Sequence, residues 1–213
     1  MENEFEFKPE VIFDIEDCTR NPKNVIGQKA GICYGKYNLS DRRVEGVLAN
    51  KHLACLRFAY ATFTVKMSIG AGRQLVRHKF LDGVERDLDF GFLQQSTRYT
   101  NKSGFQYVVP ESWKTANMEA EYINFMAISA ELYDVAIKAK VPKEDARNVL
   151  TLGASTELAA VANYQARHDF LYGDAGRLDK AAQWEIRYIA EEIEKHLESI
   201  FPFGFGPNRI RGA

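Results

Sequence analysis

Side chains that donate hydrogen bonds to anions gather at two nearby points of the sequence. The first is "RQLVRHK", which brings two arginines, a glutamine, a histidine and a lysine into residues 73–79. On a helix, Gln74 shares one face with Arg77 and His78, which follow it by three and four positions. The arginine guanidinium is a planar fork that binds phosphate or carbonyl oxygens in pairs. This face could receive a phosphate or a nucleobase edge, or it could be a solvated face paired with the acidic residues of 85–89.

The second point is "QQSTRYT", which offers two amides, two hydroxyls and a guanidinium in five consecutive residues: Gln94, Gln95, Ser96, Thr97 and Arg98. Backbone and side-chain donors of such a segment can together enclose a phosphate. Taken alone, the same composition is also typical of a polar surface loop.

Two further arginines stand in informative settings. Arg147 immediately precedes an apolar stretch, so we expect it to pair with a carboxylate. Asp145 is too near in sequence to face it on a helix, which places the expected partner elsewhere in the chain. Arg177 lies between a glycine-containing turn and the start of a long helical pattern.

Composition and charge exclude several classes of function. The net charge of −1 over 213 residues gives no basis for broad binding to nucleic acid or anionic lipid, so any anion site must be local. No apolar run approaches the roughly 20 residues that cross a bilayer. The acidic, alternating N-terminus is not a signal peptide.

The sequence also lacks the usual marks of metal, thiol or dinucleotide chemistry. The three cysteines are far apart and show neither metal-ligand spacing nor an activating setting, which predicts free thiols, no cysteine nucleophile and a cytoplasmic protein. His168 and His196 have no second ligand at a suitable spacing, so no metal is expected. No GxGxxG or Walker-type loop is present.

Periodicity predicts the elements that would position these groups. Alternation predicts strands at 11–16 and 58–69, and a short strand is expected at 105–110. Apolar spacing of three and four predicts helices over 44–56, 72–80, 151–171 and the region of Ile186–Ile200, with a buried stripe along 123–137. Residues 21–27 are interpreted as a turn, and Asp82-Gly83 as another.

These elements predict an α+β fold, in which a small antiparallel or mixed sheet, mostly from the first half, is packed by long helices of the second half. The length predicts a single domain over residues 1–213.

Taken together, the segments resemble the flavin-dependent thymidylate synthases. The signature of that family is Arg-His-Arg, a spacer, then Ser-x-Arg-Tyr, and here "RHK" is followed by "STRY". In order along the chain, "CYGK", "FTVKMSIGAGRQ", "PKEDARNVL" and "AQWEIR" extend the resemblance from about Cys33 to Phe201.

The resemblance implies roles for individual residues. Arg177 would act on the pyrimidine ring and favour its ionised form. Positions that match the substrate contacts of the family are Gln74, Arg77, Gln94, Gln95, Ser96, Thr97, Arg98, Arg147 and Arg177. Positions that match its cofactor contacts are Arg77, His78, Lys79, Gln94, Asn163, Gln165 and Asp169.

The resemblance also implies the reaction. In this family a uridylate, dUMP, is activated at C5 without an enzyme cysteine and becomes dTMP. Reduced FAD supplies hydride, methylenetetrahydrofolate the carbon, and NADPH reduces the flavin again. Members are homotetramers with sites shared between subunits.

Departures from the family pattern fall mainly on the flavin side. Lys79 stands at the second motif arginine, Phe58 at a flavin-contacting histidine, Gln165 at a common arginine and Ala181 at a frequent histidine, and the spacer is lengthened within 80–93. Three alternatives therefore stay open: a variant that methylates UMP or hydroxymethylates dUMP, a nucleotide-binding protein that has lost flavin and catalysis, and a nucleic-acid-binding module. The last is disfavoured by the charge balance.

Overall fold

The structure is a computed structural model that describes residues 4–81, 84–85 and 90–211, with side chains described outside 79–89. The chain divides into two compact units, and each is described by itself. Unit 1 comprises Met1–Glu10, Lys66–Leu75 and Leu93–Leu158, and unit 2 comprises Val11–Val65, Val76–Phe92 and Ala159–Ala213.

A four-stranded sheet has the strand order β1-β2-β6-β5. Its strands are β1 (Glu10–Cys18), β2 (Tyr60–Ser68), β5 (Phe90–Gln94) and β6 (Ser155–Asn163). A separate pair joins β3 (Phe80–Leu81) to β4 (Val84–Glu85), antiparallel. Along β2 every second residue is buried, because successive side chains of a strand point to opposite faces. The predicted α+β fold, with a small sheet and many helices, is confirmed.

Unit 2 contains most of the remaining core. Its helices are α1 (Pro22–Ile32), α2 (Asp41–Ala49), η1 (Leu53–Phe58), η2 (Arg77–Lys79), α7 (Tyr164–Tyr172) and α8 (Trp184–Ile200). The apolar residues of α8 recur at helical spacing and are fully buried at Ile186, Ile189, Ile193 and Leu197. His196 of α8 stacks on Phe13 of β1 at 5.6 Å between ring centroids, so this histidine is a packing residue.

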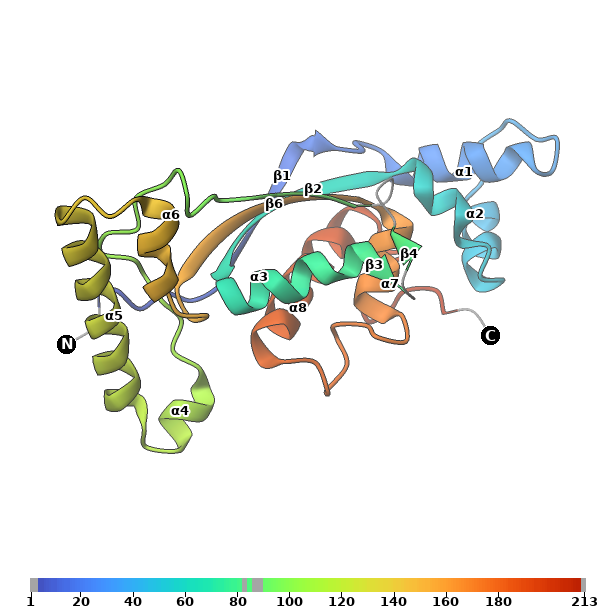
Figure 1. The fold of residues 1–213 in the computed structure, drawn as a ribbon. Helices are drawn as coiled ribbons and strands as arrows, with labels where there is room; N and C mark the ends of the chain where they lie inside the picture. Colours follow the sequence, from blue (N-terminus) through green and yellow to red (C-terminus); the bar gives the residue numbers. More distant parts are fainter. Residues whose placement is uncertain (1–3, 82–83, 86–89, 212–213) are drawn as a thin grey trace. The chain divides into compact units, whose positions relative to one another are not determined.

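Unit 1 contains α3 (Ile69–Val76, whose last residue belongs to unit 2), α4 (Glu111–Thr115), α5 (Glu119–Lys138), α6 (Lys143–Ala146) and η3 (Arg147–Val149). Helices α5 and α6 lie side by side (Figure 1). The predicted stripe of α5 is buried at Met126 and Tyr133. Ile123 and Ala130 pack, partly buried, against a cluster that includes Tyr107.

The prediction of one helix over 151–171 is wrong. Strand β6 occupies Ser155–Asn163, and α7 begins only at Tyr164. Thr156, Leu158, Ala160 and Ala162 are buried at every second position. The alanine-rich sequence favours a helix intrinsically, but its place between β2 and β5 overrides that preference, because strand propensity depends strongly on context.

Two shorter predictions are also wrong. Residues 21–27 are not a turn, because α1 begins at Pro22 and the Asn21 side chain caps it by accepting from Asn24 N. Residues 105–110 form no strand, and in the part of the chain that is described Tyr107 makes only isolated bridges, to Glu6 and Ala154. Asp82 and Gly83, interpreted as a turn, lie outside the described residues.

Candidate functional site

A polar pocket of about 510 Å³ lies within unit 1. Its volume is that of a small-molecule site. The described lining residues include two arginines and no carboxylate: Ile69, Arg73, Gln94, Gln95, Ser96, Thr97, Arg147, Asn148, Leu150, Thr151, Leu152 and Thr156. Such a lining favours an anionic ligand.

The predicted loop of donors forms one wall of this pocket. Ser96 is the centre of a tight turn: its Oγ accepts from Arg98 N at 3.2 Å, and its carbonyl accepts from Thr100 N at 3.0 Å. Gln94 donates from Nε2 to Thr156 Oγ1 at 3.2 Å. Hydroxyl residues stabilise such turns by bonding their own backbone. The loop is therefore already ordered in the folded chain.

Glycine at position 72 lets α3 pass close behind the loop. A Cβ at Gly72 would lie 3.3 Å from Gln94 Nε2 and 3.4 Å from Thr156 Cγ2. Even an alanine there would require the Gln94 amide to shift by a few tenths of an ångström.

Arg147 faces the loop across the pocket. Its Nη1 donates to Thr97 Oγ1 at 3.4 Å and its Nε to the carbonyl of Glu144 at 3.0 Å. The expectation of a carboxylate partner is wrong for the described part of the chain, where these two neutral acceptors hold Arg147. Its positive charge therefore stays available to a ligand in the pocket.

A buried lysine, Lys102, supports the loop from behind, and sequence reasoning missed it. Its Nζ donates to Gln95 Oε1 and to the carbonyl of Ser155, the latter at 3.0 Å. Burial lowers the pKa of Lys102, while Glu157 partly opposes the shift. A lone lysine carries no sequence signal, so this role depends on the fold.

Two other residues of unit 1, Arg98 and Gln74, were also predicted to bind substrate. Arg98 is exposed, and its Nε is bound to a Glu144 carboxylate oxygen at 2.6 Å. Gln74 lies on α3 and is half-buried. Neither lines the pocket. Arg73, Asn148, Thr151 and Thr156 do, although they were not predicted. The signal for Arg73 was its place in the first donor cluster, but Thr156 requires knowledge of β6.

The remaining predicted residues belong to unit 2. Arg77 is exposed on η2, and the side chain of Lys79 lies outside the described part. Arg177 follows a loop folded back on α7: its backbone N donates to the Phe170 carbonyl at 2.8 Å, and Gly173 N donates to that of Asp169 at 2.9 Å. The backbone of Arg177 is thus anchored to a helix.

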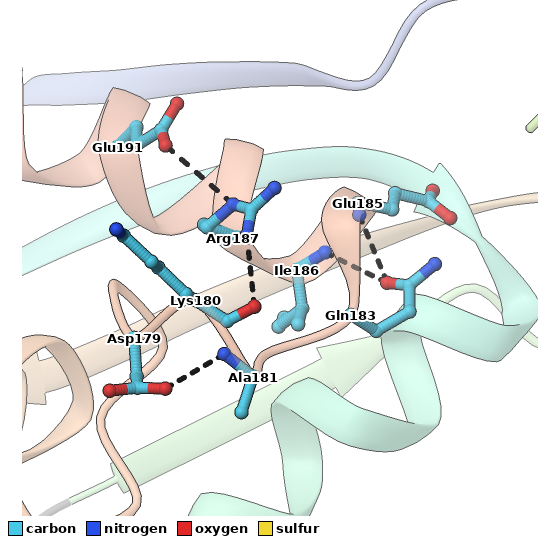
Figure 2. A network of polar contacts seen from close by, with 8 residues as sticks. All are labelled: Asp179, Lys180, Ala181, Gln183, Glu185, Ile186, Arg187 and Glu191. Carbon is cyan, nitrogen blue, oxygen red and sulfur yellow. Dashed lines mark hydrogen bonds and ion pairs between the residues drawn. The ribbon is translucent and has the colours of Figure 1, made fainter. Parts of the chain in front are cut away.

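Figure 2 shows how the segment "AQWEIR" ends this loop. The Gln183 side chain accepts from Glu185 N at 3.0 Å and from Ile186 N at 3.1 Å, so it caps α8. Arg187 of the first turns of α8 donates to the Lys180 carbonyl at 3.2 Å. The segment therefore fixes the loop downstream of Arg177 onto α8.

The side chain of Arg177 contacts the one buried histidine among the described residues. Its Nε donates to His78 Nε2 at 2.5 Å, and the His78 ring packs edge-on against Phe170 with centroids 4.8 Å apart. His78 is 3% exposed. Burial, together with the charge of Arg177, lowers the pKa of His78 to about 4.

This low pKa predicts that the protein loses stability on acidification. The unfolded chain binds a proton at His78 below about pH 6.5 and the folded chain only below about pH 4, so the free energy of unfolding falls as the pH drops through this window. We expect His78 to lower it by on the order of 2 kcal/mol between about pH 7 and about pH 5. Urea denaturation at both values measures the change. The His78→Gln variant should lack this part of the pH-dependent fall in the free energy of unfolding. If the variant loses as much stability as wild type, the loss does not come from His78.

Two residues at the start of α7 that were predicted to bind the cofactor already make side-chain hydrogen bonds within the protein. The Asn163 side chain caps α7 by accepting from Ala166 N at 2.9 Å. Gln165 Oε1 accepts from Arg57 Nε at 2.8 Å, which pairs an amide with a guanidinium. Asp169 is half-buried in the same helix. Among the described residues, no group of three or more His, Cys, Asp or Glu side chains could hold a metal ion.

Comparisons with known proteins identify the class. Over residues 14–203 the chain matches the family model described as "Thymidylate synthase complementing protein". It is 27% identical over 212 residues to a flavin-dependent thymidylate synthase of Geobacter sulfurreducens, covering 91% of this chain and 86% of that protein. A flavin-dependent thymidylate synthase of Thermococcus onnurineus is 31% identical over 150 residues, covering 68% and 56%.

A solved structure shares the fold. It is a UMP/dUMP methylase, PolB from Streptomyces cacaoi, bound with 5-Br dUMP, with a TM-score of 0.76, 19% identity and coverage of 91% of each chain. The matches define a flavin-dependent thymidylate synthase-like methyltransferase. The chain belongs to the thymidylate synthase complementing protein family, as the motifs predicted, and its identities of 27% and 31% to the two relatives named above fit a divergent member.

Proposed function

We propose that this protein transfers a one-carbon unit to C5 of a uridylate, converting dUMP to dTMP with methylenetetrahydrofolate as carbon donor and NADPH as reductant. The observation that carries the proposal is the pocket of unit 1, with two arginines and seven amide or hydroxyl side chains from 94–97 and 148–156 and no carboxylate among its described lining residues. A nucleotide monophosphate presents the anionic group that such a lining would bind.

In this proposal the loop and Arg147 bind the phosphate, assisted by Arg98, while Gln74 and Arg77 hold the nucleotide as the family resemblance implies. Arg98 would have to exchange Glu144 for the ligand. Arg177 contacts the pyrimidine, where a guanidinium stabilises negative charge on the ring and so raises electron density at C5. Arginine does this without titrating near neutral pH.

The flavin that the family implies can be tested against the residues of unit 2. Arg57 and Gln165 offer a paired guanidinium and amide, and the exposed ring of Phe58 has Lys29 Nζ 5.4 Å from its centroid. Cations beside an exposed aromatic ring fit the phosphates and the flat ring of FAD. We propose that the cofactor is held by Arg77, Asn163, Gln165 and Asp169 of unit 2, with Arg57 in addition. When bound, the reduced flavin supplies the hydride.

Release of tritium from C5-labelled nucleotide tests the reaction. Protein incubated with FAD and freed of unbound cofactor should be yellow, and after addition of NADPH and methylenetetrahydrofolate it should release tritium from dUMP. Release from UMP alone would assign the variant reaction on a ribonucleotide. Tight binding of dUMP by colourless protein, without release, would replace the proposal with a nucleotide-binding role.

Self-association into a homotetramer is part of the proposal. Helix α5 carries a solvent-facing stripe of large apolar side chains at spacings of three and four: Phe125, Ile128, Leu132 and Val135, exposed by 57%, 54%, 51% and 53%. Contiguous apolar surface of this kind marks protein–protein contacts. The proposed setting is the cytoplasm, which the three free cysteines support. In the part of the chain that is described, no helix is both long enough and apolar enough to pass through a bilayer.

The stripe gives a testable expectation. Leu132→Glu should shift the protein to a smaller species in size-exclusion chromatography with light scattering, because a charge would be buried in the contact. Ala127→Glu adds the same charge at an exposed position of α5 away from the stripe and should leave the mass unchanged. If Leu132→Glu and Ala127→Glu both keep the mass of the wild-type protein, α5 faces solvent in the assembly.

A further inference from the structure

His78 and Arg177 are held against each other by one residue of α7. The Phe170 ring packs against the imidazole, with 4.8 Å between centroids and 80° between planes. The Phe170 carbonyl accepts from the backbone N of Arg177 at 2.8 Å. Although the two residues are 99 positions apart in sequence, a single rigid support sets the 2.5 Å contact between their side chains.

The direction of this hydrogen bond fixes the protonation of His78. A guanidinium has five N–H donors and no acceptor, so Nε2 must present its lone pair and the imidazole must be neutral, with its proton on Nδ1. Burial is the main reason that the pKa of this imidazole is lowered, and the charge of Arg177 adds to the effect. His78 therefore remains a neutral acceptor across the physiological pH range.

The half-buried Arg177 is bound by a neutral imidazole, which leaves the charge of the guanidinium uncancelled. A carboxylate would also hold the guanidinium, but it would cancel the charge. Within the part of the chain that the structure describes, no carboxylate contacts Arg177. The bond to His78 uses Nε and leaves the terminal nitrogens Nη1 and Nη2, the two that bind a planar ligand in parallel.

We infer that His78 is a positioning residue, which orients Arg177 through Nε while preserving its full positive charge for the pyrimidine. The inference rests on the proposed role of Arg177. It assigns to His78 an effect through another side chain instead of the direct cofactor contact that the family resemblance implied. The Nδ1–H of His78 is buried without a partner among the described residues, and an unpaired buried donor of this kind costs stability.

Three substitutions separate orientation from charge. His78→Gln keeps a neutral acceptor near the position of Nε2, His78→Leu removes the acceptor, and His78→Glu supplies an anionic one. The probe is 5-bromo-dUMP, and ultraviolet difference spectra across pH report the N3 pKa of the bound ring. Wild type and His78→Gln should lower this pKa equally. In His78→Leu and His78→Glu the N3 pKa of the bound ring should return toward that of the free nucleotide by about one unit, which is a tenfold change in the ionisation equilibrium.

The outcomes are distinct. An N3 pKa that is lowered equally in all four proteins overturns the role of His78 and leaves that of Arg177 standing. A wild-type protein that binds 5-bromo-dUMP without lowering the N3 pKa, or does not bind it, overturns the proposed function and this inference with it. Should His78→Leu fail to fold, as judged by thermal unfolding, the comparison of Gln with Glu decides, because a merely structural histidine predicts no difference in ring ionisation between two folded variants.

Discussion

Replacing Arg177 with alanine should lower turnover by about 10²–10³-fold, the usual effect of removing one preorganised donor from a developing negative charge. The side chain is half-buried, and among the described residues it hydrogen-bonds to His78, so its removal takes little from the core. The backbone anchor of residue 177 to Phe170 does not depend on the side chain. We therefore expect a folded protein with an unchanged unfolding midpoint and almost no tritium release from C5-labelled dUMP.

The matched control removes an arginine whose only described ion pair lies on the surface. Arg20 pairs with Glu16 at 3.6 Å, with both side chains more than four-fifths exposed, so Arg20→Ala should behave as wild type. Arg177→Lys keeps the charge but loses the planar fork, and we expect it to recover only part of the rate. Undiminished turnover in Arg177→Ala would remove this residue from the mechanism.

The parts of the fold that the sequence predicted are those where one periodicity is unambiguous. Alternation along β2 and the three-four spacing of α8 each match a single kind of element. Strand β6 was missed because alanine-rich sequence suits a helix, and only the sheet on both sides of residues 155–163 selects a strand. Its identity matters for the site, since Thr156 of β6 bonds to Gln94.

The candidate site likewise contains some residues that the sequence could identify and others that it could not. Residues 94–97 could be found because donors are dense there in the sequence, and Arg147 because its segment resembles the family; the pocket brings them together. Lys102 and the bond between His78 and Arg177 could not be found, because each depends on contacts across many intervening residues. Sequence patterns thus identified groups that can bind a ligand, while the residues that support those groups required the fold.

Replacing Arg147 with alanine should weaken binding of dUMP about tenfold to hundredfold. A charge-assisted hydrogen bond contributes roughly 1.5–3 kcal/mol, and each ~1.4 kcal/mol corresponds to a tenfold change in the dissociation constant. Arg147 lines the pocket and bonds only neutral acceptors among the described residues, Thr97 Oγ1 and the Glu144 carbonyl, so its charge is not already cancelled. Isothermal titration calorimetry with dUMP measures the loss.

A change in net charge alone must be separated from loss of this contact. Lys138→Ala removes one positive charge from unit 1 at an exposed position near the end of α5 and should bind dUMP as wild type does. Deoxyuridine, which lacks the phosphate, should bind Arg147→Ala and wild type alike if Arg147 holds that group. An equal weakening for deoxyuridine would move Arg147 to the base or the sugar, and unchanged binding of dUMP would show that the phosphate lies outside this pocket. Because Arg147 and the hydroxyl of Thr97 already contact each other across the pocket, a phosphate that entered would replace one weak bond of 3.4 Å with stronger charge-assisted ones.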